Sequence, residues 1–298
     1  MDYSSSAGPG YFRPAGVVLA DRATATTQLG ASFGRMVTDK MGATQPAVAP
    51  KSVLVRVFTL LDCFSADDTE LTLAELASRT AIPKPTVHRL AKVLVEQQLL
   101  KRTATGFALG LRLFELGELV SDRRDLRDAS LPFLEELFEQ THETIHLGVL
   151  EGTEVLYFVK IVGYHAFPLP TRTGGRWPAY ASALGKALMA FGSSDPLQCL
   201  PASGLKPLTP YTITDPGRLL RELATVRRAG IAIESQESVL GNACVAAPIF
   251  DSDRRPVAAV SVSGPPMRLR PAQRAPLLRR TARRITQQVG GRLPDGWR

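Results

Sequence analysis

Two histidines that flank a glutamate at a zinc-hydrolase spacing are the first candidates for chemistry in this chain. The segment His142-Glu143-Thr144-Ile145-His146 reads HExxH. This pattern binds zinc when both histidines share one face of a helix and the glutamate acts as general base. Here the second histidine falls in a β-branched run that predicts a strand, and His165 is the only later histidine. We therefore expect no metal, no cofactor and no catalytic residue here.

Cys244 and the Gly185-Lys186 pair are weaker candidates for chemistry. A thiol can act as a nucleophile or a redox sensor, but a single cysteine in a β segment more often lines a pocket or fills a core. Gly185-Lys186 suggests a phosphate loop, yet Tyr180 stands where that motif needs its first glycine and Ala187 where it needs serine or threonine. We reject the phosphate loop. For Cys244 we keep three interpretations: a redox-sensing thiol, a pocket-lining residue and a core residue.

A basic segment over residues 84–102 has the chemistry of DNA recognition. It holds five lysines and arginines against one acid, Glu96. Short polar groups and cations at the N-terminal end of a helix reach base edges, and further cations contact phosphates. The alternative is a solvated face of a small helical subdomain. The candidate DNA-binding residues are Thr72, Lys84, Pro85, Thr86, His88, Arg89, Lys92, Lys101 and Arg102.

Three helices and a hairpin within residues 51–111 would position these side chains. An amphipathic helix starts after Ser52, and Thr72 with Glu75 forms a capping box for a second helix. Prolines at 83 and 85 open a third helix, which ends near residue 97. Segments 99–102 and 107–110 surround a Thr105-Gly106 turn and predict a hairpin. This order is that of a winged helix-turn-helix. The side chains expected to face inward from the third helix are Val87, Leu90, Val93 and Leu94.

After residue 111 the pattern predicts a linker helix over 112–128 and then a larger domain over 129–298. Strands are expected at 144–150 and 155–161, joined by a turn, and a small-residue helix at 181–191. An amphipathic helix at 219–228 and a short strand at 231–233 follow. A second hairpin pairs 244–250 with 256–263, and a helix with one arginine-rich side ends the chain. Strands with helices on their faces indicate an α+β sensor-like domain.

Composition limits the class of protein without naming a function. The 298 residues suggest two domains, and 44% hydrophobic with 21% charged residues is typical of a globular protein. Residues 1–50 are rich in Ala, Gly, Ser, Thr and Pro, which predicts disorder, and Met36 or Met41 could be the true start. We find no signal peptide and no apolar run near the roughly 18 residues of a membrane span.

The cysteines and the net charge add two further limits. Three widely separated cysteines argue against a disulfide framework and fit a reducing cytoplasm. The net charge of +8 is matched by the segment 267–298 alone, which carries nine arginines and one acid. Since a solvated or interface face explains such a helix better than DNA binding, the overall charge is weak support for the DNA-binding segment.

The chain resembles the IclR-type bacterial transcription regulators from about Ser52 to Arg292. The resemblance rests on collinear segments in both halves of the chain. It implies a winged helix-turn-helix, a linker helix and a GAF-like α/β effector-binding domain. It also implies homodimers or tetramers on double-stranded, palindromic operator DNA. The matching segments are 73–77 (LAELA), 82–90 (IPKPTVHRL), 143–147 (ETIHL), 181–187 (ASALGKA), 212–215 (TITD), 227–230 (RRAG), 240–241 with 244–248 (LG and CVAAP) and 261–265 (SVSGP).

The same resemblance places a small-molecule effector in the C-terminal domain. Backbone N–H groups and hydroxyls suit a carboxylate, so an organic acid is one candidate effector. Two positions depart from the family pattern: Glu234 stands where aspartate is common, and Asn242 where a larger apolar residue is common. The acid would oppose a simple carboxylate unless a cation or proton intervenes, so the ligand class stays open. The effector-binding residues carried over are Ala183, Leu184, Glu234, Asn242, Cys244, Ser261 and Ser263.

Three functions remain in competition at this stage. The first is a cytoplasmic, ligand-responsive regulator of metabolic genes, either repressor or activator, that has no membrane partner. The second is an enzyme whose N-terminal domain is an adaptor and whose reactive site is the HExxH segment or Cys244. The third is a constitutive DNA-binding protein whose second domain only dimerises. The resemblance favours the first.

Overall fold

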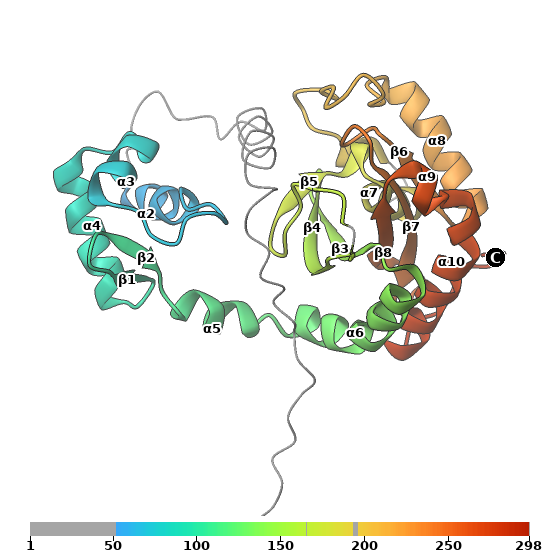
Figure 1. The fold of residues 1–298 in the computed structure, drawn as a ribbon, viewed down its shortest axis with the longest axis horizontal. Helices are drawn as coiled ribbons and strands as arrows, with labels where there is room; N and C mark the ends of the chain where they lie inside the picture. The colour runs from blue at the N-terminus through green and yellow to red at the C-terminus, as the bar shows by residue number, and fades with distance from the viewer. Residues whose placement is uncertain (1–51, 165, 193–195, 298) are drawn as a thin grey trace, which may run out of the picture. The chain divides into compact units, whose positions relative to one another are not determined.

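The computed structural model describes residues 52–164, 166–192 and 196–297 (Figure 1). The extension 1–50, for which the sequence predicts disorder, lies outside the described residues, as does His165. The helix-turn-helix part and the larger C-terminal part are described separately below.

The N-terminal part has the predicted three helices and hairpin. The helices are α2 (Val53–Asp62), α3 (Leu73–Thr80) and α4 (Lys84–Glu96), and the strands are β1 (Leu100–Arg102) and β2 (Phe107–Leu109). The strands pair antiparallel, with Leu100 opposite Leu109. Ten buried side chains from all five elements and their connections form one core, so the hairpin is fixed to the helices as a wing.

Local signals set the turn between α3 and α4. Thr72 caps α3 in the predicted capping box with Glu75, and Ala81 ends the helix in the left-handed region at φ 54°. Pro85 lies in the first turn of α4, where a missing N–H costs nothing. The prediction that Val93 is buried is wrong, since its side chain is 48% exposed. The core side of α4 is completed by Ala91 at the i, i+3, i+4, i+7 spacing, which leaves Val93 at its edge.

The structure has two helices where the sequence predicts one linker helix. A short helix α5 (Arg112–Glu118) ends before Leu119-Val120, and α6 (Ser121–Thr141) follows. Val120 has φ −77° and ψ 82°, outside the helical region, which separates the two segments. The second helix runs without a break through residues 128 and 129, where the sequence places the domain boundary.

The C-terminal part is built on one six-stranded antiparallel sheet in the order β5-β4-β3-β8-β7-β6. The predicted hairpins are β3 (Thr144–Glu151) with β4 (Glu154–Ile161) and β7 (Ala243–Phe250) with β8 (Pro256–Gly264). They meet through β3 and β8 at the centre of the sheet. The edge strands are β5 (Arg176–Pro178), which the sequence pattern missed, and β6 (Ala232–Ser235).

Helices cover both faces of this sheet, which confirms the α+β class. On one face, alternate apolar residues of β3, β7 and β8 pack with α6 and α10 (Pro271–Gln288), which lie side by side in Figure 1. The other face carries α7 (Ala183–Phe191), preceded by a 3₁₀ turn at Ala179–Ala181. Gly185 lets α7 approach that turn, since a Cβ there would lie 2.1 Å from the Ala179 carbonyl oxygen.

The remaining elements are α8 (Pro216–Ala229), α9 (Pro266–Leu269) and a 3₁₀ turn at Pro196–Cys199. Helix α8 packs on α7 and is capped by Asp215, whose carboxylate accepts the Arg218 N–H at 2.6 Å. In the part of the chain that the structure describes, no helix combines the length and apolar character of a membrane span.

Candidate functional site

Helix α4 presents its predicted polar residues to solvent. Lys84, His88, Arg89 and Lys92 are exposed, while Val87, Leu90, Ala91 and Leu94 are buried on the opposite side. Pro85 is exposed beside them, and Thr86 is half-buried. The helix thus displays a cationic surface on a buried apolar support, as a recognition helix requires.

The wing adds two cations to this surface. Lys101 and Arg102 lie on β1, and both are exposed. The Arg102 guanidinium carbon lies 5.4 Å from the centroid of the Phe107 ring, which holds that side chain over the hairpin. Thr72 differs from the other candidates because its hydroxyl accepts the Glu75 N–H and donates to the Glu75 carboxylate. Its hydrogen-bonding capacity is therefore used in the helix cap.

The HExxH segment does not form a helical metal site. Helix α6 ends before His142, which takes the left-handed region at φ 54°, and His146 lies inside β3. The buried Glu143 carboxylate forms a bidentate ion pair with Arg268. His146 instead shares a 2.9 Å hydrogen bond with the Thr171 hydroxyl. Among the described residues, no cluster of three or more His, Cys, Asp or Glu side chains could hold a metal ion.

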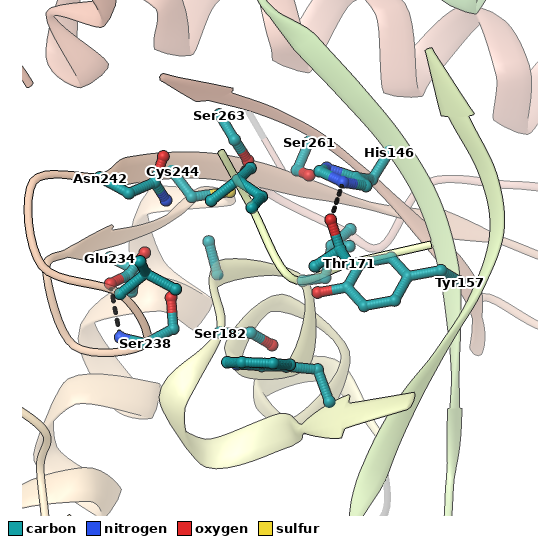
Figure 2. A pocket seen from close by; sticks show the side chains of 15 residues that line it. His146, Tyr157, Thr171, Ser182, Glu234, Ser238, Asn242, Cys244, Ser261 and Ser263 are labelled. Atoms are coloured by element: carbon teal, nitrogen blue, oxygen red, sulfur yellow. Dashed lines mark hydrogen bonds between the residues drawn. The ribbon is translucent and has the colours of Figure 1, made fainter. Parts of the chain in front are cut away.

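The sheet face under α7 brings polar side chains together in two rows. Antiparallel register places Glu234 opposite Cys244, and Cys244 opposite Ser263. The next row places Ser261 opposite His146. Because alternate residues of a strand share a face, both rows point toward α7. Together with the first turn of α7 they enclose a pocket (Figure 2).

All seven residues expected to bind an effector line this pocket. Sequence reasoning missed the others, although the register of β3 against β8 would have added His146 once the strands were paired. Thr171, Leu169 and the strand β5 that carries Trp177 come from a segment without a clear period, so no sequence signal pointed to them. The lining residues not predicted are His146, Tyr157, Leu169, Thr171, Trp177, Ser182, Ser238 and Val239.

Two loops close the pocket, and a lysine holds each of them. The Lys160 ammonium donates to the carbonyl oxygens of Leu169 at 3.3 Å and Thr171 at 2.5 Å. The fully buried Lys186 lies 2.5 Å from Glu237 Oε1 in the second loop.

The same two loops meet at Gly241, where a Cβ would lie 3.2 Å from the Phe167 ring. The enclosed space is ≈ 30 Å³, room for about one or two waters. A larger ligand therefore requires the loops to separate.

Four buried polar atoms in this pocket have no hydrogen-bond partner among the described residues. They belong to Trp177 (Nε1), Glu234 (Oε2), Asn242 (Oδ1) and Ser261 (Oγ). An unpaired buried polar group costs about 1–3 kcal/mol. Because four such atoms gather around one cavity, this cavity is the candidate site for a polar ligand or an ordered water.

The charge states in the pocket follow from burial. Burial raises the pKa of Glu234 to about 7, against two backbone N–H bonds to its Oε1 from Glu237 and Ser238. Burial, with Lys160 nearby, lowers the pKa of His146 to about 3, so its imidazole is neutral. Burial also raises the pKa of Cys244 to about 12, and its sulfur accepts a hydrogen bond from Ser263 at 3.1 Å. A thiol in this state is a poor nucleophile.

A winged helix-turn-helix on the same chain as a domain with a closed, polar, incompletely satisfied pocket defines a class of protein. This class comprises DNA-binding transcription regulators that respond to a small molecule.

Comparison with known proteins specifies the family. The model for the IclR helix-turn-helix domain matches residues 53–104, and the model for the bacterial transcriptional regulator IclR C-terminal domain matches residues 119–289. The chain therefore belongs to the IclR family of bacterial transcriptional regulators. It is a ligand-responsive, sequence-specific DNA-binding regulator. Of the functions in competition, the family therefore supports the regulator and not the enzyme.

Individual relatives extend over most of the chain. The HTH-type transcriptional regulator KipR of Bacillus subtilis is 35% identical over 213 residues, 71% of this chain and 85% of that protein. The transcriptional repressor IclR of Escherichia coli is 30% identical over 257 residues, 84% of this chain and 94% of that protein. The structure of an IclR homolog from Microbacterium hydrocarbonoxydans complexed with 4-hydroxybenzoate has a TM-score of 0.74 at 31% identity, and covers 80% of this chain and 99% of that one.

Proposed function

We propose that this regulator recognises operator DNA with α4 and the wing, and that its operator affinity changes when a small organic acid binds in the pocket under α7. Effector binding is supported by four buried polar atoms around one cavity that have no partner among the described residues. The proposed domains are a DNA-binding helix-turn-helix over 51–111, a linker over 112–128 and an effector-binding domain over 129–298. Since operator DNA is cytoplasmic in bacteria, we place the protein there, with metabolic genes as its targets.

The proposed DNA contacts divide by chemistry. Lys84, Thr86, His88 and Arg89 belong to the first two turns of α4 and are assigned to base edges in the major groove. Lys92, Lys101 and Arg102 are assigned to phosphates. The exposed ring of Pro85 at the helix start is assigned to an apolar contact with the DNA. Thr72 is assigned a backbone role, in which it fixes the start of α3 beside the DNA.

The carboxylate of the effector is assigned to the N-terminus of α7. The first backbone N–H groups of that helix, at Ala183 and Leu184, precede its first intrahelical hydrogen bond and lie at the positive end of its dipole. Ser261 and Ser263 offer hydroxyls from β8, and Cys244 fills the floor between them. The 4-hydroxybenzoate bound by the Microbacterium relative is a carboxylate of this kind.

Exposed apolar residues on two helices support a proposal of dimerisation. Leu54 and Phe58 on α2 are 71% and 62% exposed, and Phe114 on α5 is 66% exposed. Apolar stripes of this size on a helix are typical of a protein interface. We propose that they pair two chains into a dimer, or two dimers into a tetramer. Effector binding would then shift the spacing of two recognition helices and so the operator affinity.

The first experiment measures binding of the full chain to the DNA upstream of its own gene, across a salt series with non-specific competitor. We expect a specific complex whose affinity falls steeply with salt. Arg89→Ala should weaken it by about 1–3 kcal/mol, whereas the exposed Arg221→Ala on α8 should not. Equal affinities of wild-type protein and Arg89→Ala would remove α4 from the contact.

A further inference from the structure

One side of the effector pocket is formed by two hydrogen-bond acceptors that the protein itself does not satisfy. Glu234 is 1% exposed, and its Oε1 accepts the N–H groups of Glu237 at 2.5 Å and Ser238 at 3.0 Å. Its Oε2 is buried without a partner. Asn242 is 3% exposed, and its Oδ1 is also buried without a partner. Figure 2 shows these two side chains on one side of the pocket, with His146, Thr171 and Ser261 on the other.

The side chain of Asn242 is not needed to fold its loop. The loop is closed by backbone groups: the Asn242 N–H donates to the Val239 carbonyl at 3.2 Å, and the Asn242 carbonyl accepts the Gln236 N–H at 2.8 Å. Asn242 is also the only asparagine in the chain. A leucine would fill the same site without leaving an unpaired acceptor.

Among the described residues, no side chain donates a hydrogen bond to Glu234 Oε2. The buried Lys186 ammonium acts on Glu234 only through space, because it lies 2.5 Å from Glu237 Oε1 and 4.0 Å from Glu222 Oε1. Glu234 and Asn242 each have a buried oxygen without a partner among the described residues, and a hydrogen-bond donor on the ligand would satisfy it.

We propose that Glu234 and Asn242 determine effector specificity by binding a donor group, a hydroxyl or a protonated amine, at the end of the ligand away from its carboxylate. This inference rests on the pocket being the effector site, and it narrows the ligand class to hydroxy acids and amino acids. A simple carboxylic acid of the same size leaves both acceptors buried and unpaired. The selection against it is therefore strong, as for other sites that are built to hydrogen-bond a hydroxyl or amine.

A thermal-shift titration of the full chain with matched acids tests this. The probes are 4-hydroxybenzoate against benzoate, lactate against propionate, and 3-aminopropanoate against propionate. We expect a donor-bearing acid to bind at least about tenfold more tightly than its partner. Asn242→Leu should remove that difference, and the exposed Gln288→Leu on α10 should keep it. The proposal would be overturned if the two acids of each pair bound equally well, or if Asn242→Leu kept the preference for the donor-bearing acid.

Two further measurements test the role of Asn242 separately from the assignment of the pocket as the effector site. Without any ligand, Asn242→Leu should raise Tm by about 2–4 °C, whereas a fall would show that the amide is structural and would overturn the proposal even if no probe binds. Because the chain has one asparagine, selective ¹⁵N-asparagine labelling gives one pair of side-chain amide signals, which should shift with a donor-bearing acid. Binding that survives Ser261→Ala and Asn242→Leu unchanged would instead reject the pocket as the effector site.

Discussion

The ammonium of Lys186 on α7 lies 2.5 Å from Glu237 Oε1 in the loop that closes the pocket, and Lys186 is fully buried. The Glu237 backbone N–H in turn donates to Glu234 Oε1 at 2.5 Å. The ion pair therefore connects the helix on one side of the pocket with the acid on the other. Gly185-Lys186 is thus part of the support of the pocket, which explains its sequence without a phosphate loop.

Lys186→Met is expected to destabilise the effector domain strongly. Removal of one partner leaves Glu237 as an uncompensated buried charge, which costs about 3–5 kcal/mol. The double variant Lys186→Met, Glu237→Leu should recover most of this loss, since both charges are then gone. Urea unfolding followed by circular dichroism gives the free energies, with the exposed Lys206→Met as control. A double variant as unstable as the single one would show that the pair is not the cause.

Glu234 should contribute to the pH dependence of the free energy of unfolding on the acidic side of neutrality. Burial raises the pKa of this carboxyl from 4.5 to about 7 in the folded protein. The folded state therefore holds a proton that the unfolded state has lost, and stability decreases as pH rises from about 4.5 to 7. The limit is on the order of 3 kcal/mol. Glu237, whose pKa burial also raises, acts in the same direction.

His146 acts in the opposite direction, so a difference measurement is needed. Its pKa falls from 6.5 to about 3, which stabilises the fold as pH rises through that range. Comparing wild type with Glu234→Gln cancels the histidine. The stability of the wild type relative to the variant should fall between pH 4.5 and 7 and be constant above. A difference independent of pH would contradict the raised pKa.

The elements with a strong period were predictable from the sequence, and those without one were not. The capping box at Thr72 and the two hairpins with their turns were found because each has a local cause. The break at Leu119-Val120 and the three-residue strand at Arg176–Pro178 have no such local signal. The burial of Val93 was misjudged because one residue at the edge of an apolar face can point either way.

The pocket residues that could be predicted are those on or next to the paired strands and those on α7. Resemblance to the family gave the seven residues, and the structure places all of them around one cavity. The HExxH histidines were correctly judged to be separated, because the helix ends at His142. The sequence could not show which side-chain groups are hydrogen-bonded, such as the Ser263 hydroxyl that donates to Cys244, because this depends on side-chain directions.

The hydrogen bond from Ser263 to Cys244 predicts unequal effects of the two pocket serines on the effector response. Ser261→Ala with Ser263→Ala should blunt the response but leave operator affinity without effector unchanged. Among the single variants, Ser261→Ala should account for most of the loss, because the Ser263 hydroxyl already donates to the Cys244 sulfur at 3.1 Å. The measurement is operator release as a function of effector concentration, with the tightest of the matched acids. A dose–response curve that is the same in all three variants would remove both serines from the pocket.

The exposed apolar side of α5 gives the last prediction. Phe114 is 66% exposed, and Leu119, which follows the helix, is 76% exposed. If these residues bury against a second chain, a charge at Phe114 would be desolvated in the dimer without a partner. Phe114→Asp should therefore convert the dimer to monomers in light scattering and weaken operator binding by more than about tenfold, since one half-site remains per molecule. Tyr211→Asp, at a residue that is 56% exposed in the effector domain, serves as the control. A dimer that persists in Phe114→Asp would move the interface away from the linker, to α2 or to the effector domain.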